Sequence, residues 1–179
     1  WIISPVGFGC NFVGNWKGFE DLRRLGLISQ IPRLVAVQAE GSPSLVKAYE
    51  GGLDEGVPGP QDTIAGGISQ VVTPNSILAL KAIRSSKGTA ITVTDGEMLS
   101  SIPLLAQKAG IYAEPAGVAA LAGLKKLVKE RKVSKSDRVL VIISGSGLKD
   151  PNSSLSLKGS CFPQIEPSFS DFEKNLRGQ

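Results

Sequence analysis

A glycine-rich stretch near the start of the chain contains residues that could hold a phosphate group. Gly7 and Gly9 lie between an apolar run, residues 1–3, and a segment from Phe12 onward in which apolar residues recur at helical spacing. Glycine lets the backbone approach a ligand closely or turn with a positive φ. A helix N-terminus adds free N–H groups and a partial positive charge. We therefore favour a phosphate cradle at residues 7–11.

Two other interpretations of this stretch stay open on the residues alone. A dinucleotide-binding loop needs Gly-x-Gly-x-x-Gly and an acidic residue after the next strand. Glu40 does end the next apolar run, but Phe12 stands where the third glycine is needed. A tight turn between a strand and a helix, with no ligand, would use the same glycines. The glycines by themselves do not separate these possibilities.

A second glycine-rich stretch, residues 144–147, directly follows the clearest apolar run of the chain, residues 138–143. Both stretches therefore begin where a predicted strand ends. In parallel sheets, ligands bind beyond the carboxyl ends of the strands. One ligand could thus contact both stretches.

Composition excludes several classes of function. The chain has 179 residues, enough for one domain with a substantial core, and a net charge of +4. Its basic residues concentrate at positions 125–138 without interleaved aromatics, which predicts a solvated helix face and no nucleic-acid binding. It has no histidine and only two cysteines, so we expect neither a histidine base nor a zinc site nor a disulfide framework. No apolar run approaches the roughly 18 residues of a membrane span.

Strand-like and helix-like segments alternate along the chain. This alternation predicts an α/β fold with an open, mainly parallel sheet and helices on both faces. We expect the strands near residues 2–3, 34–38, 90–93 and 139–143, with a further short strand at 111–113.

Local signals set expectations for the helices. Thr94 and Glu97 form a capping-box pattern, and Ser42 is expected to cap a short helix that Pro43 begins. Pro103 should kink or split the helix that contains it. The apolar residues of two helices predicted to face the core are Ile77, Leu80, Ile83, Val118, Leu121, Leu124 and Val128.

Six motifs, taken together and in order, resemble the threonine synthase family of fold-type II enzymes that depend on pyridoxal 5'-phosphate. The resemblance covers residues 1–151. The motifs are Pro5-Val-Gly-Phe-Gly-Cys-Asn followed by Trp16-Lys-Gly-Phe, Val37-Gln-Ala-Glu-Gly, Thr63-Ile-Ala-Gly-Gly-Ile, Glu114-Pro-Ala and Ser144-Gly-Ser-Gly-Leu-Lys-Asp-Pro.

The resemblance implies roles for ten residues around the cofactor. The cofactor phosphate would be held by backbone N–H groups, Ser144 would lie close to the pyridine nitrogen, and Glu114 would be a carboxylate near the cofactor. Residues 66–68 would lie over one face of the ring. The implied cofactor-binding residues are Gly7, Phe8, Gly9, Cys10, Asn11, Gly66, Gly67, Ile68, Glu114 and Ser144.

Cys10 departs from the family pattern, which usually has glycine at its position. A glycine there could adopt a positive φ, which a cysteine rarely adopts, so the loop conformation depends on the backbone φ of Cys10. From its residue type we expect the Cys10 side chain to be a small buried filler.

The family's Schiff-base lysine belongs to a Ser-Phe-Lys-Asp motif upstream of the phosphate loop, and this chain contains no such motif. No catalytic residue is therefore assigned within it. We expect residues 1–158 to be the C-terminal half of the cofactor-binding fold, residues 159–179 to be a tail, and the chain alone to be inactive. The missing N-terminal half would then be its main partner, and apolar surface that this half covers should be exposed.

The activity implied by the resemblance is the conversion of O-phosphohomoserine and water to threonine and phosphate. This carbon–oxygen lyase of amino-acid biosynthesis would be a cytoplasmic homodimer that binds a phosphorylated amino acid, with no nucleic acid or membrane partner. One alternative is another fold-type II enzyme, such as threonine dehydratase or cysteate synthase. A different class of alternative is a non-catalytic α/β domain that binds a phosphate or a nucleotide.

Overall fold

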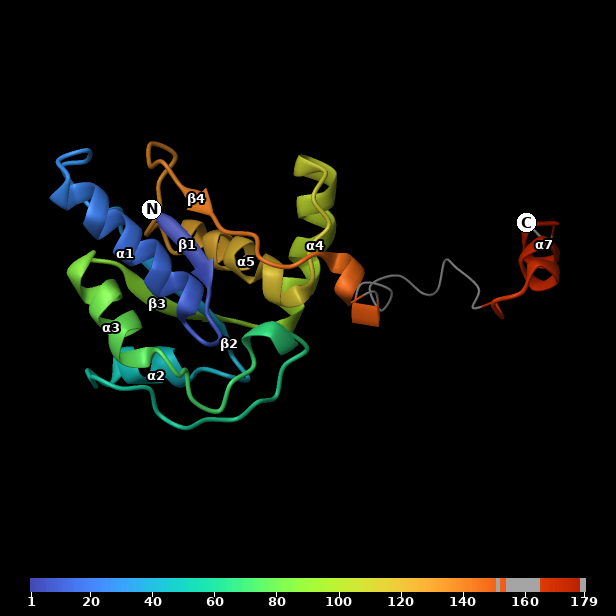
Figure 1. Cartoon of the computed structure of the whole chain (residues 1–179), viewed down its shortest axis with the longest axis horizontal. Coiled ribbons are helices and arrows are strands. Elements are labelled where there is room, and N and C mark those ends of the chain that lie inside the picture. Colours follow the sequence, from blue (N-terminus) through green and yellow to red (C-terminus); the bar gives the residue numbers. More distant parts are fainter. Residues whose placement is uncertain (151, 154–164, 178–179) are drawn as a thin grey trace.

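The computed structural model describes residues 1–150, 152–153 and 165–177. Its centre is a sheet of parallel strands in the order β3-β2-β1-β4 (Figure 1). The strands are β1 (Ile2–Pro5), β2 (Leu34–Ala39), β3 (Thr89–Val93) and β4 (Leu140–Val141). The predicted parallel sheet is confirmed. β4 is shorter than predicted, since only Leu140 and Val141 pair with β1.

Helices cover both faces of the sheet, as predicted (Figure 1). Consecutive strand residues point to opposite faces. Ile3, Val35 and Val37 therefore contribute to one buried cluster, and Ile2 and Leu34 to the other. The helices are α1 (Cys10–Arg24), α2 (Ser44–Glu50), α3 (Ser76–Ser85), α4 (Asp95–Ala109), α5 (Pro115–Lys129) and α7 (Phe169–Arg177), with short 3₁₀ turns η1 (Gly66–Ile68) and η2 (Gly147–Lys149).

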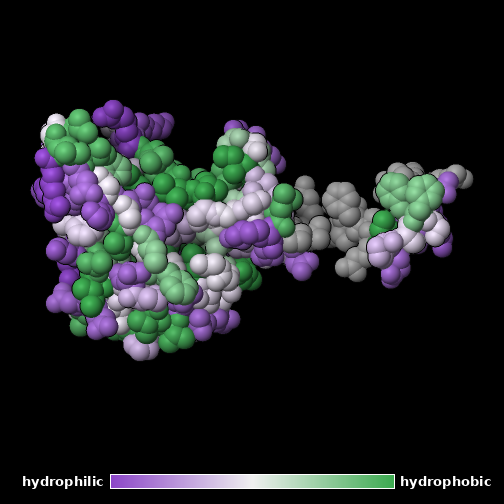
Figure 2. Space-filling model, viewed as in Figure 1, coloured by the Kyte–Doolittle hydropathy of each residue, from purple (hydrophilic) through white to green (hydrophobic). Residues whose placement is uncertain are grey.

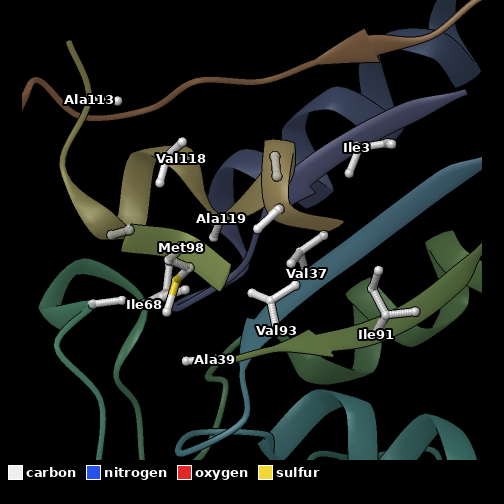
Figure 3. Packing of buried hydrophobic residues seen from close by; sticks show 14 of the residues in the cluster. Ile3, Val37, Ala39, Ile68, Ile91, Val93, Met98, Ala113, Val118 and Ala119 are labelled. Atoms are coloured by element: carbon white, nitrogen blue, oxygen red, sulfur yellow. The ribbon is translucent and has the colours of Figure 1, made fainter. Parts of the chain in front are cut away.

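The core between the sheet and helices α4 and α5 consists of tightly packed aliphatic side chains (Figure 3). Met98 of α4 and Val118 of α5 are fully buried there with Val37 of β2. On the other face, Phe12 of α1 and Leu80 of α3 are buried together in the second cluster. The first turn of α1 is thus anchored by Phe12, which holds the glycine-rich stretch before it in place.

Several local predictions for the helices are confirmed and others are wrong. The Thr94–Glu97 capping box is present, with Glu97 N donating to Thr94 Oγ1 at 3.1 Å. Pro103 does not split α4, which continues from Asp95 to Ala109. A proline costs the helix one hydrogen bond and some strain, and the buried side chains of α4 on either side of it, including Met98 and Leu105, keep both halves packed on the core.

Three further predictions are corrected. Residues 111–113 form no strand but a single antiparallel bridge between Ala113 and Ser146. Ser42 does not cap α2; its hydroxyl instead pairs with the backbone of Gln70. Two of the residues predicted to face the core, Ile77 and Val128, are instead 58% and 51% exposed. The buried faces of their helices include the preceding residues, Ser76 and Leu127, and the next residue lies about 100° further around the helix.

Apolar side chains gather on the surface beside the sheet edge, over β4 and α5 toward α4 (Figure 2). Leu140 is 53% exposed. Val139, Val141 and Ile143 are partly buried against the cluster that contains Ile3 and Val37. An edge strand with apolar side chains and unpaired backbone groups is a ready site for pairing with another segment.

Among the described residues, no helix combines the length and apolarity needed to cross a membrane.

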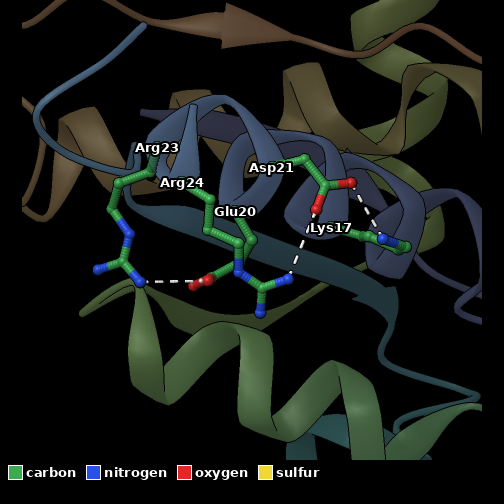
Figure 4. Close-up of polar contacts among 5 residues, drawn as sticks. All are labelled: Lys17, Glu20, Asp21, Arg23 and Arg24. Carbon is green, nitrogen blue, oxygen red and sulfur yellow. Dashed lines mark hydrogen bonds and ion pairs between the residues drawn. The ribbon is translucent and has the colours of Figure 1, made fainter. Parts of the chain in front are cut away.

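The exposed side of α1 carries a group of ion pairs (Figure 4). Asp21 accepts from Lys17 at 3.0 Å and lies 3.7 Å from Arg24. All three side chains are about half exposed or more, so solvent screens their attraction.

Replacing Asp21 by asparagine is expected to change the free energy of unfolding by less than about 0.5 kcal/mol. Exposed pairs of this kind contribute little, and the Asp21 carboxylate also lies toward the negative C-terminal end of α1, which offsets part of the attraction. Urea denaturation of the parent and the Asp21→Asn protein measures this difference. A loss above about 1.5 kcal/mol would contradict the assignment of these pairs as weak surface contacts.

Candidate functional site

The stretch at residues 7–11 links β1 to α1 and presents unpaired backbone donors. Gly9 is the N-cap of α1 with φ 87°, and α1 begins at Cys10. Within the described part of the chain, the backbone N–H groups of residues 7–11 donate no hydrogen bond. The first turn of α1 contains no acidic side chain, and no side chain caps the helix. Free donors at a helix N-terminus without a nearby carboxylate fit an anion.

Gly7 brings this stretch against the η1 turn. A Cβ atom at Gly7 would lie 2.8 Å from the carbonyl oxygen of Gly67 and 2.9 Å from Cα of Ile68. No larger residue fits this position without moving backbone. The structure therefore places Gly7 in direct contact with Gly67 and Ile68, although about 60 residues separate them in sequence.

The η1 turn in turn contacts the start of α5. A Cβ atom at Gly67 would lie 3.1 Å from Cβ of Ala116 and 3.5 Å from Oε1 of Glu114. Glu114 is the N-cap residue of α5, and its side chain is only 15% exposed. The Nζ atom of Lys149 lies 3.4 Å from Oε1 of Glu114 and balances its charge.

The second glycine-rich stretch packs on the same helix start. Glu114 N donates to Gly145 O at 3.1 Å, and a Cβ atom at Gly145 would overlap the Glu114 carboxylate. At Gly117, a Cβ atom would lie 2.6 Å from Gly145 O. The first stretch, η1, the start of α5 and the second stretch are therefore in contact one after another.

Ser144 is exposed at the carboxyl end of β4. Ile2 pairs with Leu140, and Ile142 N donates to Ile3 O at 2.9 Å, which continues the parallel register. Extending this register places Ser144 beside the end of β1, immediately before the stretch at residues 7–11. The two glycine-rich stretches thus follow neighbouring strands, β1 and β4, at the carboxyl ends of the sheet.

Cys10 differs from both expectations stated for it. The positive φ of the loop belongs to Gly9, and Cys10 is the first residue of α1 with an ordinary backbone conformation. Its side chain is exposed and not a buried filler. Asn75 Nδ2 lies 3.1 Å from Cys10 Sγ. A cysteine is tolerated here because the left-handed residue precedes it.

Residue types alone did not single out Gln38, which is fully buried in β2. Its Oε1 accepts from Leu45 N at 2.8 Å and Val46 N at 3.1 Å, which caps the start of α2. Its Nε2 donates to Val6 O at 3.2 Å and Thr73 Oγ1 at 3.0 Å. A single polar residue within the apolar run of a buried strand was the signal that could have identified it.

Comparison with known proteins identifies the family. The model of the family described as "Pyridoxal-phosphate dependent enzyme" matches residues 1–145. The chain belongs to this family of pyridoxal-phosphate dependent enzymes. The glycine-rich stretches that follow β1 and β4 therefore belong to the fold of a cofactor-dependent enzyme family.

The relatives found by sequence are longer than this chain. It is 38% identical over 155 residues to a threonine synthase of Methanocaldococcus jannaschii, covering 86% of this chain and 38% of that protein. It is 40% identical over 151 residues to a threonine synthase of Methanosarcina acetivorans, covering 84% of this chain and 37% of that protein. The chain thus spans about two fifths of the length of these relatives.

A solved structure shares the fold. A fungal L-serine ammonia-lyase from Rhizomucor miehei superposes with a TM-score of 0.66 at 22% identity, covering 81% of this chain and 44% of that one. At this identity the likeness shows the fold alone. It agrees with the fold-type II architecture expected from the motifs.

The residues at 7–11 fit the phosphate of pyridoxal phosphate. They offer unpaired backbone N–H groups at the positive end of α1, and no described acidic side chain lies in its first turn. The missing Cβ at Gly7 and the left-handed Gly9 keep the backbone in the tight path between β1 and α1.

Proposed function

We propose that this chain forms the phosphate- and ring-binding part of a threonine synthase, which converts O-phosphohomoserine and water to threonine and phosphate. The observation that carries the proposal is the row of unpaired N–H groups at residues 7–11, packed through Gly7 on η1. The two relatives described above, both threonine synthases, support the choice among enzymes of this family.

In this proposal the backbone N–H groups of Gly7, Phe8, Gly9, Cys10 and Asn11 hold the cofactor phosphate. Because these donors belong to the backbone, their side chains are free to vary at the solvent side. When bound, pyridoxal phosphate supplies the electron withdrawal that stabilises negative charge on a substrate amino acid.

The ring of the cofactor is assigned to the second half of the site. Residues 66–68 would cover one face of the ring, and the space beside Gly66, where a Cβ atom would meet nothing within 4 Å, supports this assignment. The Ser144 hydroxyl would donate a hydrogen bond to the pyridine nitrogen, an arrangement that suits an unprotonated, neutral nitrogen. Glu114, paired with Lys149, orients the residue 144–147 loop through Gly145.

The proposal includes a partner for the apolar sheet edge. This chain, with residues 1–158 proposed as one half of the fold, would join the remainder of the enzyme, which would supply the Schiff-base lysine. The proposed boundary at residue 158 lies outside the residues that the structure describes. The exposed Leu140 and the unpaired backbone of β4 support this edge as the place of contact. A homodimeric state and a cytoplasmic location are proposed on the family resemblance alone.

The decisive experiment incubates the full-length protein with pyridoxal phosphate and O-phosphohomoserine and measures the release of phosphate and of threonine. Equal amounts of both products are expected. A parallel incubation with threonine in place of O-phosphohomoserine tests for a dehydratase: deamination of threonine, without phosphate release in the first incubation, would assign that activity instead. A protein that binds no pyridoxal phosphate would fit a non-catalytic phosphate- or nucleotide-binding domain.

Replacing Ser144 by alanine is expected to lower kcat about five- to tenfold and to change cofactor affinity less. The change removes one hydrogen bond, typically worth about 1 kcal/mol. Steady-state kinetics at saturating cofactor measure kcat, with Ser100→Ala on the exposed side of α4 as the matched control. An unchanged kcat in Ser144→Ala would remove Ser144 from the site.

A further inference from the structure

Asn75 stands at the N-cap of α3 but makes no side-chain hydrogen bond to that helix. Asparagine is favoured at this position because its side-chain oxygen usually accepts from the N–H of the second or third helical residue. Here that stabilisation is given up. The Asn75 side chain is engaged elsewhere.

Two donors of Asn75 converge on one carbonyl of the phosphate-binding stretch. Asn75 N donates to Phe8 O at 3.1 Å, and Asn75 Nδ2 donates to the same oxygen at 3.2 Å. Nδ2 also lies 3.1 Å from Cys10 Sγ. A carbonyl oxygen only accepts, so its contact fixes which end of the Asn75 amide faces the loop. The side chain therefore clamps the peptide group between Phe8 and Gly9.

The clamp determines where the next N–H points. In a planar trans peptide the C=O and the N–H point in opposite directions, and the described residues contain no cis peptide. With Phe8 O held by Asn75, the Gly9 N–H faces the opposite side, where no described group accepts it. Glycine by itself allows this peptide group to turn either way.

The segment that bears Asn75 is itself firmly held. A Cβ atom at Gly9 would lie 3.2 Å from Cβ of Asn75 and 3.3 Å from Cγ2 of Thr73, so residues 73–75 form a wall behind Gly9. Thr73 is fully buried, accepts from Gln38 Nε2 at 3.0 Å and donates its N–H to Ser44 Oγ at 3.0 Å. The clamp is thus tied to β2 and α2.

We propose that Asn75 is a positioning residue for the cofactor phosphate: it holds the Phe8–Gly9 peptide so that the Gly9 N–H faces the anion. This inference rests on the proposed function, since it assigns a further residue to the same phosphate site. It concerns the phosphate alone, because among the described residues the Asn75 side chain donates only to Phe8 O and Cys10 Sγ, both in the phosphate-binding stretch.

The test replaces Asn75 by serine in the full-length protein and measures dissociation constants for pyridoxal phosphate and for pyridoxal, which lacks the phosphate. Serine is a good N-cap, so α3 keeps or gains stability, while the Nδ2 donor is lost and the backbone bond to Phe8 O remains. Affinity for pyridoxal phosphate should fall about five- to tenfold, as for one lost hydrogen bond. Affinity for pyridoxal and kcat at saturating cofactor should stay within about twofold of the parent values. The melting temperature should change by no more than roughly a few degrees.

Asn175→Ser is the matched control, because Asn175 also donates Nδ2 to a carbonyl, that of Asp171 at 2.8 Å, within α7. Asn75→Ala serves as a second variant that cannot cap α3. Equal losses for both ligands, or no loss for either, in Asn75→Ser would overturn the positioning role while leaving the proposed function intact. An unsubstituted protein that binds pyridoxal phosphate no more tightly than pyridoxal would overturn both.

Discussion

Replacing Gln38 by leucine is expected to lower the free energy of unfolding by about 4 kcal/mol. Leucine fills much of the same space but has no polar atom, so it would leave Leu45 N, Val46 N and Val6 O unpaired in the interior. An unsatisfied buried donor or acceptor costs roughly 1–3 kcal/mol. Because Gln38 is fully buried, water cannot replace the lost partners without opening the structure.

Urea denaturation of the full-length protein measures this loss. Gln61→Leu is the matched control, since the exposed Gln61 donates a single bond to Ser69 O at 3.2 Å; its cost should stay below about 1 kcal/mol. A Gln38→Leu protein as stable as the Gln61→Leu protein would show that the buried polar groups find other partners. The role of Gln38 as the link between β1, α2 and the segment before α3 would then be wrong.

Replacing Gly9 by aspartate is expected to weaken pyridoxal phosphate binding at least about 100-fold. The new carboxylate would lie beside the doubly charged phosphate, and two like charges about 4 Å apart near a protein surface repel by roughly 4 kcal/mol. The side chain would also have to adopt the left-handed conformation of Gly9, with its Cβ 3.2 Å from Cβ of Asn75.

Gly9→Ala separates these two effects, because alanine brings the same Cβ and the same backbone strain without a charge. The dissociation constant of pyridoxal phosphate is measured for both variants at low and at high salt. The aspartate variant should bind more weakly than the alanine variant, and high salt should narrow the gap by screening the repulsion. If the two variants bind equally well, the phosphate does not lie at residues 7–11.

The glycine-rich stretch and the order of strands and helices could be predicted because their signals are local. Strand and helix periodicities, the capping box of Thr94 and Glu97, and glycines placed after apolar runs all involve residues within a few positions of one another. A backbone hydrogen bond in a helix or a cap joins near neighbours, so a short stretch of sequence carries much of the signal for these features. The parallel sheet and the position of the first stretch at the start of α1 followed from such signals.

The tertiary structure alone decided which distant residues lie beside the candidate site. Asn75 contacts Phe8 across 67 positions, Gln38 joins Val6 to Thr73, and Gly7 lies against Gly67. It also decided that Cys10 is exposed, because the direction of a side chain depends on which elements pack beside it. Such contacts form only when the stacking of helices on the sheet brings separate segments together, and no spacing within one segment carries that information.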